Sequence, residues 1–250
     1  FTTYLARCSY LMERGKPVSD VLWYLGDEIN HKPDQNAPFP IGFKYDYCNQ
    51  DVLLNRLAVD NGDVITPEGL RYRVLWLPEA PRMCVETLDK LYTLIQAGAT
   101  VIGEAPVGLA TLSGGKAAQK HFNKMVKKIW GNNARQGIRP IGKGRMISGM
   151  TLDEALTKLN MEPDVKGRDV LWSHRNVDQA DWYYVAAPQG KEFAGQLDFR
   201  NKGNVEIWDP LTGDVTPAVY ETKGDRTMVT VDLPQAGSCF VVFRKDRPVT

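Results

Sequence analysis

The sequence predicts an α/β part with a mostly parallel, helix-covered sheet, followed by an all-β part that forms an antiparallel β-sandwich. Helix-like and strand-like segments alternate along the first two-thirds of the 250 residues, as they do in α/β proteins. From about residue 164 the segments are short and strand-like, and turn residues separate them. This length can hold two small domains with cores of their own. We therefore place the α/β domain at 16–163 and the sandwich at 164–250.

The first residues predict a helix that belongs to something longer. The chain starts at Phe1, without a Met or a signal peptide, and residues 2–14 already carry apolar side chains at helical spacing. Gly15 ends this pattern. We therefore expect residues 1–15 to be the tail of a preceding domain.

The elements of the α/β domain follow from periodicity and from start and stop signals. Leu88, Leu91, Leu94 and Ile95 share one face of an amphipathic helix that ends at Gly98. A capping box opens the helix that begins at Thr151. The expected elements are helices at 49–57, 85–97, 117–130 and 151–159, strands at 18–25, 72–77, 99–103 and 145–147, and a hairpin at Asn61-Gly62. We expect the first three strands to be neighbours near the centre of one sheet, with helices on both of its faces.

The sandwich is predicted from strand-like runs in the last third of the chain. Their expected ranges are 170–175, 182–187, 193–199, 205–208, 215–222, 227–233 and 239–244. Alternation within the last two runs places Val229, Val231, Leu233, Phe240 and Val242 inside the sandwich.

Composition excludes several classes of function. Lys and Arg number 31 against 30 Asp and Glu, so the net charge of +1 gives no reason to expect nucleic acid as a partner. No apolar stretch approaches the roughly 18–20 residues that span a bilayer. The four cysteines are far apart in the sequence, and the three histidines form no metal-ligand pair. We therefore expect no metal and no cofactor.

One segment is close to a phosphate-binding motif. Gly137-x-x-x-x-Gly142-Lys143-Gly144 has the spacing of a P-loop. A helix precedes it, a strand follows it, and Gly144 stands where the hydroxyl residue for magnesium should be. This context favours a turn that leads into an edge strand.

Carboxylates follow two of the predicted strands. Asp27 and Glu28 come after the first strand and Glu104 after the third, where open α/β sheets place ligands. Adjacent residues that leave a strand point to opposite sides, so Asp27 and Glu28 form a poor acid and base pair. These carboxylates either cap turns or contribute to a site shared with another domain.

A second candidate site is the loop at 42–51. Tyr45, Asp46, Tyr47 and Asn49 combine aromatic rings with carboxylate and amide groups, a mixture that suits a carbohydrate. Asp and Asn are also common in turns and at helix N-termini. Both interpretations, a ligand site and a set of caps, stay open.

Several stretches together resemble one protein family. They are YLARCSYLMERGKPVSDVLWYLGDE (4–28), GFKYDYCNQDVLLNRL (42–57), GLRYRVLWLPE (69–79), LIQAGATVIGEAP (94–106), GKGRM (142–146), HRNVDQADWYYVA (174–186), VEIWDPLTGDVTP (205–217) and FVVFRK (240–245). In order and spacing they are similar to the C-terminal third of large glycoside hydrolases related to the family-106 α-L-rhamnosidases, which are typical of polysaccharide-degrading Bacteroidetes.

This resemblance implies a periplasmic or secreted enzyme that acts on terminal sugars such as rhamnose. Its catalytic (β/α)₈ barrel would lie upstream, so residues 1–15 would be the tail of that barrel and no catalytic residue would lie in this chain. The α/β part would be an amidotransferase-like domain of the flavodoxin type. The expected partners are the upstream catalytic domain and a carbohydrate substrate.

Two further functions stay open. The chain could be a non-catalytic carbohydrate-binding or interdomain scaffold module. A self-sufficient α/β hydrolase would need a nucleophile elbow, and the sequence has no G-x-S-x-G motif.

Overall fold

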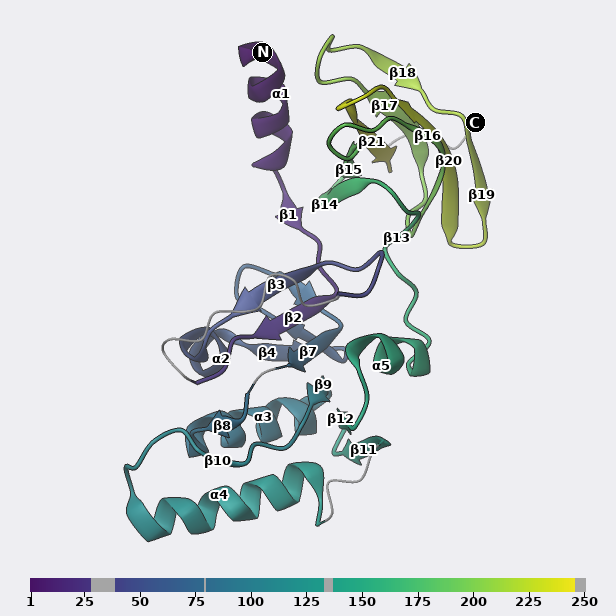
Figure 1. The fold of residues 1–250 in the computed structure, drawn as a ribbon. Coiled ribbons are helices and arrows are strands. Elements are labelled where there is room, and N and C mark those ends of the chain that lie inside the picture. Colours follow the sequence, from purple (N-terminus) through teal and green to yellow (C-terminus); the bar gives the residue numbers. More distant parts are fainter. Residues whose placement is uncertain (28–38, 79, 133–136, 246–250) are drawn as a thin grey trace. The chain divides into compact units, whose positions relative to one another are not determined.

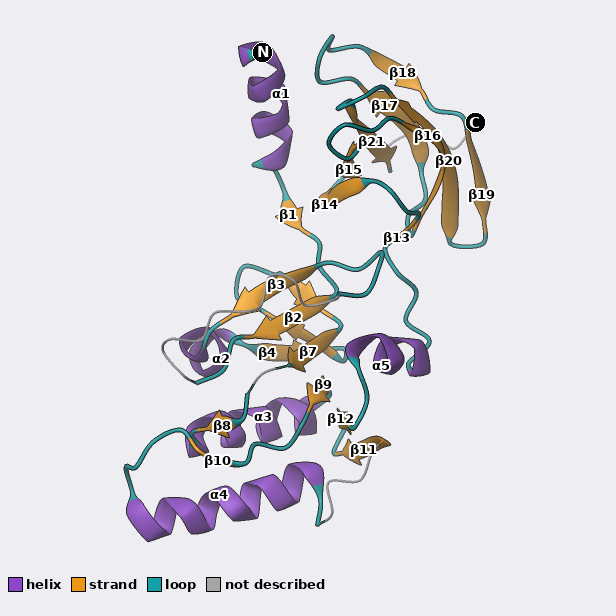
Figure 2. Cartoon of the chain, viewed as in Figure 1, coloured by secondary structure: helices purple, strands orange, loops and turns teal. Residues whose placement is uncertain are grey.

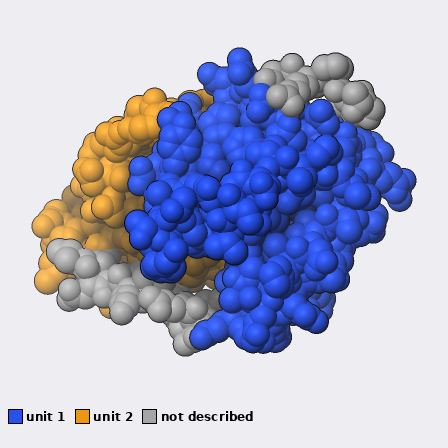
Figure 3. Space-filling model, turned by 90° about the horizontal axis from the view of Figure 1, so that it is seen from above, with its two compact units in different colours: residues 1–18, 41–44, 162–250 blue, residues 19–40, 45–161 orange. Residues whose placement is uncertain are grey.

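The chain forms two compact units in the computed structural model, which describes residues 1–27, 39–78, 80–132 and 137–245 (Figure 1). Unit 1 comprises residues 1–18, 41–44 and 162–250, and unit 2 comprises residues 19–40 and 45–161 (Figure 3). Such units describe spatial compactness and not independent folding. The domain boundaries predicted at 15/16 and 163/164 therefore stay predictions.

Unit 2 is built around a six-stranded sheet. Its strand order is β11 (Gly137–Ile141), β12 (Gly144–Ser148), β9 (Thr100–Gly103), β7 (Val74–Leu77), β2 (Val21–Tyr24) and β3 (Tyr45–Cys48). Neighbouring strands run parallel from β12 to β3, whereas β11 pairs with β12 in the antiparallel direction. The prediction that β2, β7 and β9 are neighbours near the centre is confirmed.

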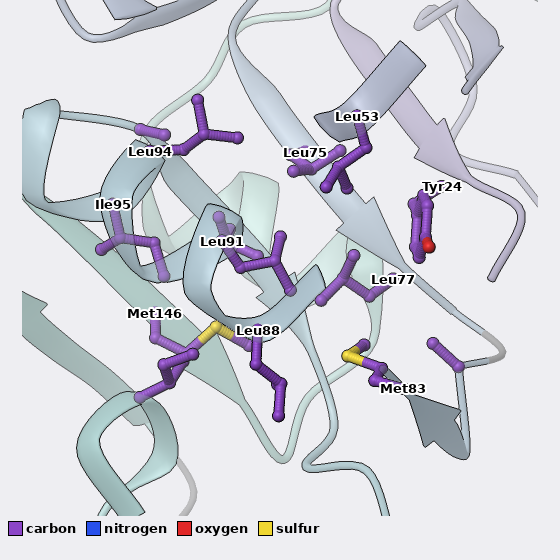
Figure 4. Close-up of a cluster of buried hydrophobic side chains, with 14 of the residues drawn as sticks. Tyr24, Leu53, Leu75, Leu77, Met83, Leu88, Leu91, Leu94, Ile95 and Met146 are labelled. Atoms are coloured by element: carbon purple, nitrogen blue, oxygen red, sulfur yellow. The ribbon is translucent and has the colours of Figure 1, made fainter. Parts of the chain in front are cut away.

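One face of this sheet is covered by a layer of helices. Leu22, Leu75 and Val101 on the strands pack in one core with side chains of α2 (Gln50–Arg56), α3 (Val85–Ala97) and α4 (Gly115–Trp130). Figure 4 shows Leu53 of α2 and the buried face of α3 in this core. The short helix α5 (Leu152–Lys158) carries the predicted capping box and buries its apolar side chains outside that core.

Smaller elements complete unit 2. Strands β4 (Ala58–Asp60), β5 (Asp63–Ile65) and β6 (Arg71–Tyr72) form an antiparallel sheet, and β8 (Arg82–Met83) pairs with β10 (Gly108–Leu109). The predicted hairpin at Asn61-Gly62 joins β4 to β5, with φ of 51° and 90° at the two turn residues.

The P-loop-like segment is a β-hairpin. Gly142 and Lys143 form the turn between β11 and β12. A Cβ at Gly144 would lie 2.3 Å from the carbonyl oxygen of Ala99. Glycine is therefore required there by the close approach of two backbones and not by a phosphate.

Unit 1 is an antiparallel β-sandwich with one helix outside it (Figure 2). The larger sheet has the order β1 (Lys16–Pro17), β14 (Leu171–Val177), β15 (Ala180–Ala186), β21 (Ser238–Arg244), β17 (Asn204–Trp208) and β18 (Val215–Pro217). The smaller sheet has the order β13 (Val165–Lys166), β16 (Phe193–Phe199), β20 (Arg226–Leu233) and β19 (Tyr220–Lys223).

The strand β21 is buried on both of its faces. Cys239, Val241 and Phe243 pack in the core between the sheets, together with Val229, Val231 and Leu233 of β20. Phe240 and Val242 pack on the opposite face with Leu11 of helix α1 (Thr2–Met12). The prediction that these two side chains point into the sandwich is therefore wrong, because α1 buries them from outside.

The fold class predicted for the chain is also wrong. Most strand pairings among the described residues are antiparallel, the large sheet of unit 2 is mixed, and its layer of α2, α3 and α4 covers one face. Alternation of helices and strands indicates a doubly covered parallel sheet only where each helix crosses between parallel neighbours. Here α2 leads into the β4–β5 hairpin, and α5 leads out of the sheet into unit 1.

Candidate functional site

The structure separates the predicted site residues into different places. Side chains alternate along β3, so Tyr45 and Tyr47 lie on one face of the sheet and Asp46 lies on the other. Asn49 follows this strand, and Asp27 follows β2. Glu28 lies outside the described residues.

Five aromatic side chains meet on the sheet face that lies opposite to the helix layer. This cluster, here named the aromatic face, consists of Trp23, Phe39, Tyr45, Tyr47 and Trp76. The ring centroid of Trp23 lies 4.6 Å from that of Trp76 and 5.1 Å from that of Tyr45. Such distances are those of favourable aromatic pairs.

The aromatic face is open at Tyr47. The side chain of Tyr47 is 48% exposed, whereas Trp23 beneath it is 3% exposed. The buried Nε1 of Trp23 has no hydrogen-bond partner among the described residues. Aromatic rings bind the C–H face of a sugar, and the phenol hydroxyls of Tyr45 and Tyr47 can bond to its hydroxyl groups.

Asp27 lies at the carboxyl ends of β2 and β7, beside the N-terminus of α3. Its carboxylate accepts hydrogen bonds from the Tyr24 hydroxyl, from the backbone N–H of Cys84 and, at 2.9 Å, from the Thr87 hydroxyl. Burial raises the pKa of Asp27, although the amide of Cys84 and the hydroxyl of Thr87 favour the ionised form.

Open α/β sheets bind their ligands at the carboxyl ends of two such strands. In the strand order, β2 is followed by β3 toward one edge of the sheet, and β7 is followed by β9 toward the other edge. In this chain the Asp27 carboxylate occupies the positive end of α3 itself. Burial and the neighbouring Asp27 also raise the pKa of the Cys84 thiol, so this cysteine is not an activated nucleophile.

The other polar candidates accept hydrogen bonds from groups of unit 2. Asp46 accepts from the Tyr72 hydroxyl at 3.0 Å, and Asn49 accepts from the Val52 amide at 2.9 Å as the N-cap of α2. Glu104 accepts from the Gly149 amide at 2.6 Å. A role of these residues in ligand binding stays a prediction.

The structure also reveals a buried charged cluster that was not predicted from the sequence. The His174 ring lies between two carboxylates, with Nδ1 at 2.7 Å from Asp164 and Nε2 at 3.0 Å from Asp181. Lys245 forms an ion pair with Asp181, and the Tyr183 hydroxyl donates to Asp164. The hairpin register of β14 and β15 was the signal that could have placed His174 near Asp181.

Hydrogen bonding determines the charge of this cluster. Burial lowers the pKa of His174, but the bonds to Asp164 and Asp181 outweigh it and leave that pKa raised. Burial raises the pKa of Asp181, yet His174, Asn176 and Lys245 together hold it well below its usual range. The two carboxylates lie on opposite ring nitrogens, so they do not converge on a shared ion.

The three histidines do not form a common site. His31 lies outside the described residues, and His121 pairs with Asp89 in unit 2, whereas His174 belongs to unit 1. Within the described ranges no group of three His, Cys, Asp or Glu side chains is placed to hold a metal ion.

No helix in the described part of the chain is long and apolar enough to cross a membrane.

Comparison with known proteins identifies relatives that are much longer than this chain. A protein of Formosa agariphila that carries the name "Putative beta-glucuronidase" is 30% identical over 251 residues, which are 98% of this chain and 21% of that protein. The structure of a rhamnosidase from Novosphingobium sp. PP1Y is 30% identical with a TM-score of 0.90, and the match covers 99% of this chain and 25% of the other.

More distant structures share the fold alone. A β-galactosidase from Bacillus circulans sp. alkalophilus is 9% identical with a TM-score of 0.56, over 96% of this chain and 43% of that protein.

The family model described as alpha-L-rhamnosidase, glycoside hydrolase family 106, matches residues 1–222. The chain therefore belongs to glycoside hydrolase family 106, the α-L-rhamnosidase family.

Proposed function

We propose that the chain is the C-terminal accessory part of an exo-acting, α-L-rhamnosidase-like glycoside hydrolase. The rest of the parent polypeptide would supply a catalytic barrel upstream of Phe1, and the enzyme would act in the periplasm or outside the cell. The lengths of the relatives support this proposal, because this chain spans 21% of one and 25% of the other.

The observation that carries the proposal is that the candidate carboxylates of this chain already accept hydrogen bonds from the protein. Glycosidic cleavage needs two carboxyl groups on either side of one bond, roughly 5–9.5 Å apart. Asp27 is half-buried and accepts hydrogen bonds from three donors, Asp46 is bonded to Tyr72, and Glu104 is bonded to a backbone amide. These candidates are engaged in holding the fold together, which is not the state of a poised acid and base.

The aromatic face gives the accessory part a role in the parent enzyme. Tyr45 and Tyr47 would contribute one wall of a sugar pocket that the barrel completes. This wall supplies stacking surface and hydroxyl groups, whereas the barrel supplies the acid and the base.

Assays of two proteins test this proposal. Residues 1–250 and the full-length parent are purified and incubated with aryl α-L-rhamnosides and aryl galactosides. We expect turnover by the parent and none above buffer by residues 1–250. Turnover by residues 1–250 that disappears in Glu104→Gln or Asp27→Asn would place the active site in this chain and overturn the proposal.

A second function, a carbohydrate-binding module, is favoured by the exposed ring of Tyr47. In that case residues 1–250 alone would bind a rhamnose-containing polysaccharide, and Tyr47→Ala would abolish the binding. Under the accessory role, this affinity appears only in the parent protein. Isothermal titration of both proteins with the same polysaccharide separates the two functions.

A further inference from the structure

A groove of about 500 Å³ lies in unit 1 between α1 and the hairpin of β17 and β18. Tyr10 and Leu11 line it from the helix, Trp208 and Val215 from the hairpin, and Phe240 from β21. All of these residues belong to unit 1, so the groove is a feature of that unit alone.

The charged side chains that line the groove are Arg7, Asp209 and Asp214, and the first two bond to backbone groups of the hairpin. The Arg7 guanidinium donates to the carbonyl oxygens of Pro210, at 3.0 Å, and Leu211, at 2.7 Å. Asp209 accepts from the Leu211 amide at 2.7 Å, and the Trp208 indole donates to Glu206 at 2.9 Å. The lining of the groove is predominantly apolar, which suits apolar protein side chains better than the many hydroxyl groups of a sugar.

Apolar side chains are exposed on both sides of the groove. Arg7 is the one charged residue in Thr2–Met12, and its charge is directed at the hairpin. Tyr10 is 57% exposed on the helix, and Val215 is 54% exposed on the opposite side of the groove. Grouped exposure of apolar side chains is typical of a surface that another protein surface covers.

The lengths of the relatives favour an occupant from the same polypeptide. The Formosa protein and the Novosphingobium rhamnosidase are four to five times as long as this chain, which covers 21% and 25% of them. A covalently tethered domain is present at a high effective concentration, so a small groove is enough to hold it. A second copy of the chain would need an interface of about 1,200–2,000 Å².

We propose that this groove is the docking site of an apolar segment of the catalytic domain in the same polypeptide. The proposal rests on the proposed function, since it takes a catalytic domain to precede α1. It assigns α1 and the β17–β18 hairpin to an interdomain interface, with Tyr10 and Val215 as its apolar contacts.

Photo-cross-linking in the full-length parent tests the proposal. A p-benzoylphenylalanine is placed at Tyr10, and equal amounts of unlabelled and ¹⁵N-labelled protein are mixed before irradiation. We expect cross-linked peptides that join position 10 to a segment outside residues 1–250 of the same chain. The same probe at Val219, which is 74% exposed and does not line the groove, serves as control and gives no such product.

A pair of charge variants tests the groove itself, with the yield of the same cross-link as the readout. Val215→Glu places a carboxylate in the apolar groove and lowers the yield of the cross-link about tenfold, whereas Val219→Glu leaves it unchanged. Cross-links confined to residues 1–250, cross-links between labelled and unlabelled chains, or a yield that Val215→Glu does not change would each overturn the proposal. Glycosidase activity of the parent is measured separately, so a failure of the proposed function is distinguishable from a failure of the docking site.

Discussion

The Nδ1 atom of His174 lies 2.7 Å from a carboxylate oxygen of Asp164, and both side chains are buried. The backbone amide of Asp164 also donates to the carbonyl oxygen of Gly42 at 2.8 Å. Asp164 therefore belongs both to the buried cluster and to the contact between two segments of unit 1, residues 41–44 and 162–250. Since a buried charge needs its partner, the stability of the cluster depends on the proton of His174.

The first prediction concerns alkaline pH. The raised pKa of His174 means that the folded chain binds the imidazole proton more tightly than the unfolded chain does. Its contribution is complete below the unfolded-state pKa of about 6.5 and is lost as the pH rises through the folded-state pKa. We expect the free energy of unfolding to fall above neutral pH, and urea titrations from pH 6 to pH 9 measure this slope.

Two variants show whether His174 causes this dependence of the free energy of unfolding on pH. His174→Gln should remove most of the slope and destabilise the chain at pH 6 by about 3 kcal/mol, because two buried carboxylates lose the positively charged group that lies between them. His121→Gln, in which the lost partner is the half-exposed Asp89, should keep the wild-type slope. Equal slopes in His174→Gln and the wild type would contradict the prediction.

The second prediction concerns Asp27. Asp27→Ala leaves the donors of Tyr24, Cys84 and Thr87 without this acceptor in a partly buried place, and we expect a loss of about 3 kcal/mol in the free energy of unfolding. Asp51→Ala is the matched control, since Asp51 is exposed and accepts only from Asn55 of the same helix among the described bonds. Its loss should be about 0.5 kcal/mol. Similar losses in both variants would show that Asp27 does not hold α3.

The third prediction concerns the attachment of α1. The indole N–H of Trp182 donates to the carbonyl oxygen of Leu11 at 3.1 Å in a buried position. Trp182→Phe removes this donor, so we expect faster amide exchange across α1 and a loss of about 1–3 kcal/mol in stability. Trp172→Phe on the neighbouring strand should leave exchange in α1 unchanged. Hydrogen exchange measured by mass spectrometry compares the two variants.

The fourth prediction concerns the aromatic face. Tyr47→Ala removes a half-exposed ring and should change stability by no more than about 0.5 kcal/mol. In the parent enzyme it should raise KM about tenfold with kcat unchanged, because stacking holds substrate and transition state alike. Tyr92→Ala, on helix α3, should leave KM unchanged. Steady-state kinetics on aryl rhamnosides provide the measurement, and an unchanged KM in Tyr47→Ala would contradict the role of this wall.

Local features of the fold are predictable from the sequence because their causes are local. The apolar positions of α3, the capping box at Thr151 and the turn at Asn61-Gly62 are each determined by neighbouring residues. The burial of Phe240 and Val242 has a distant cause, since α1 lies more than two hundred residues earlier. With α1 in place, β21 shows no alternation of buried and exposed residues, and periodicity cannot show which face is inside.

The candidate site was predictable only where its arrangement depends on neighbouring residues. Alternation along β3 is sufficient to separate Asp46 from Tyr45 and Tyr47. It does not show that Trp23 and Trp76 come from neighbouring strands to join the two tyrosines, because that depends on the strand order. The cluster of His174 with Asp164 and Asp181 likewise required the hairpin register and the position of a loop.

The strand order of unit 1 has a consequence for the synthesis of the protein. β21, the last of the described strands, lies between β15 and β17 and separates them in the larger sheet. During translation, β15 and β17 therefore leave the ribosome before the strand that joins them exists, and their exposed edges must wait for it. All residues of unit 2 have been synthesised by residue 161, well before β21 is made. A nascent chain that stalls after β17 and before residue 238 would thus carry β15 and β17 with unpaired edges, which favour aggregation.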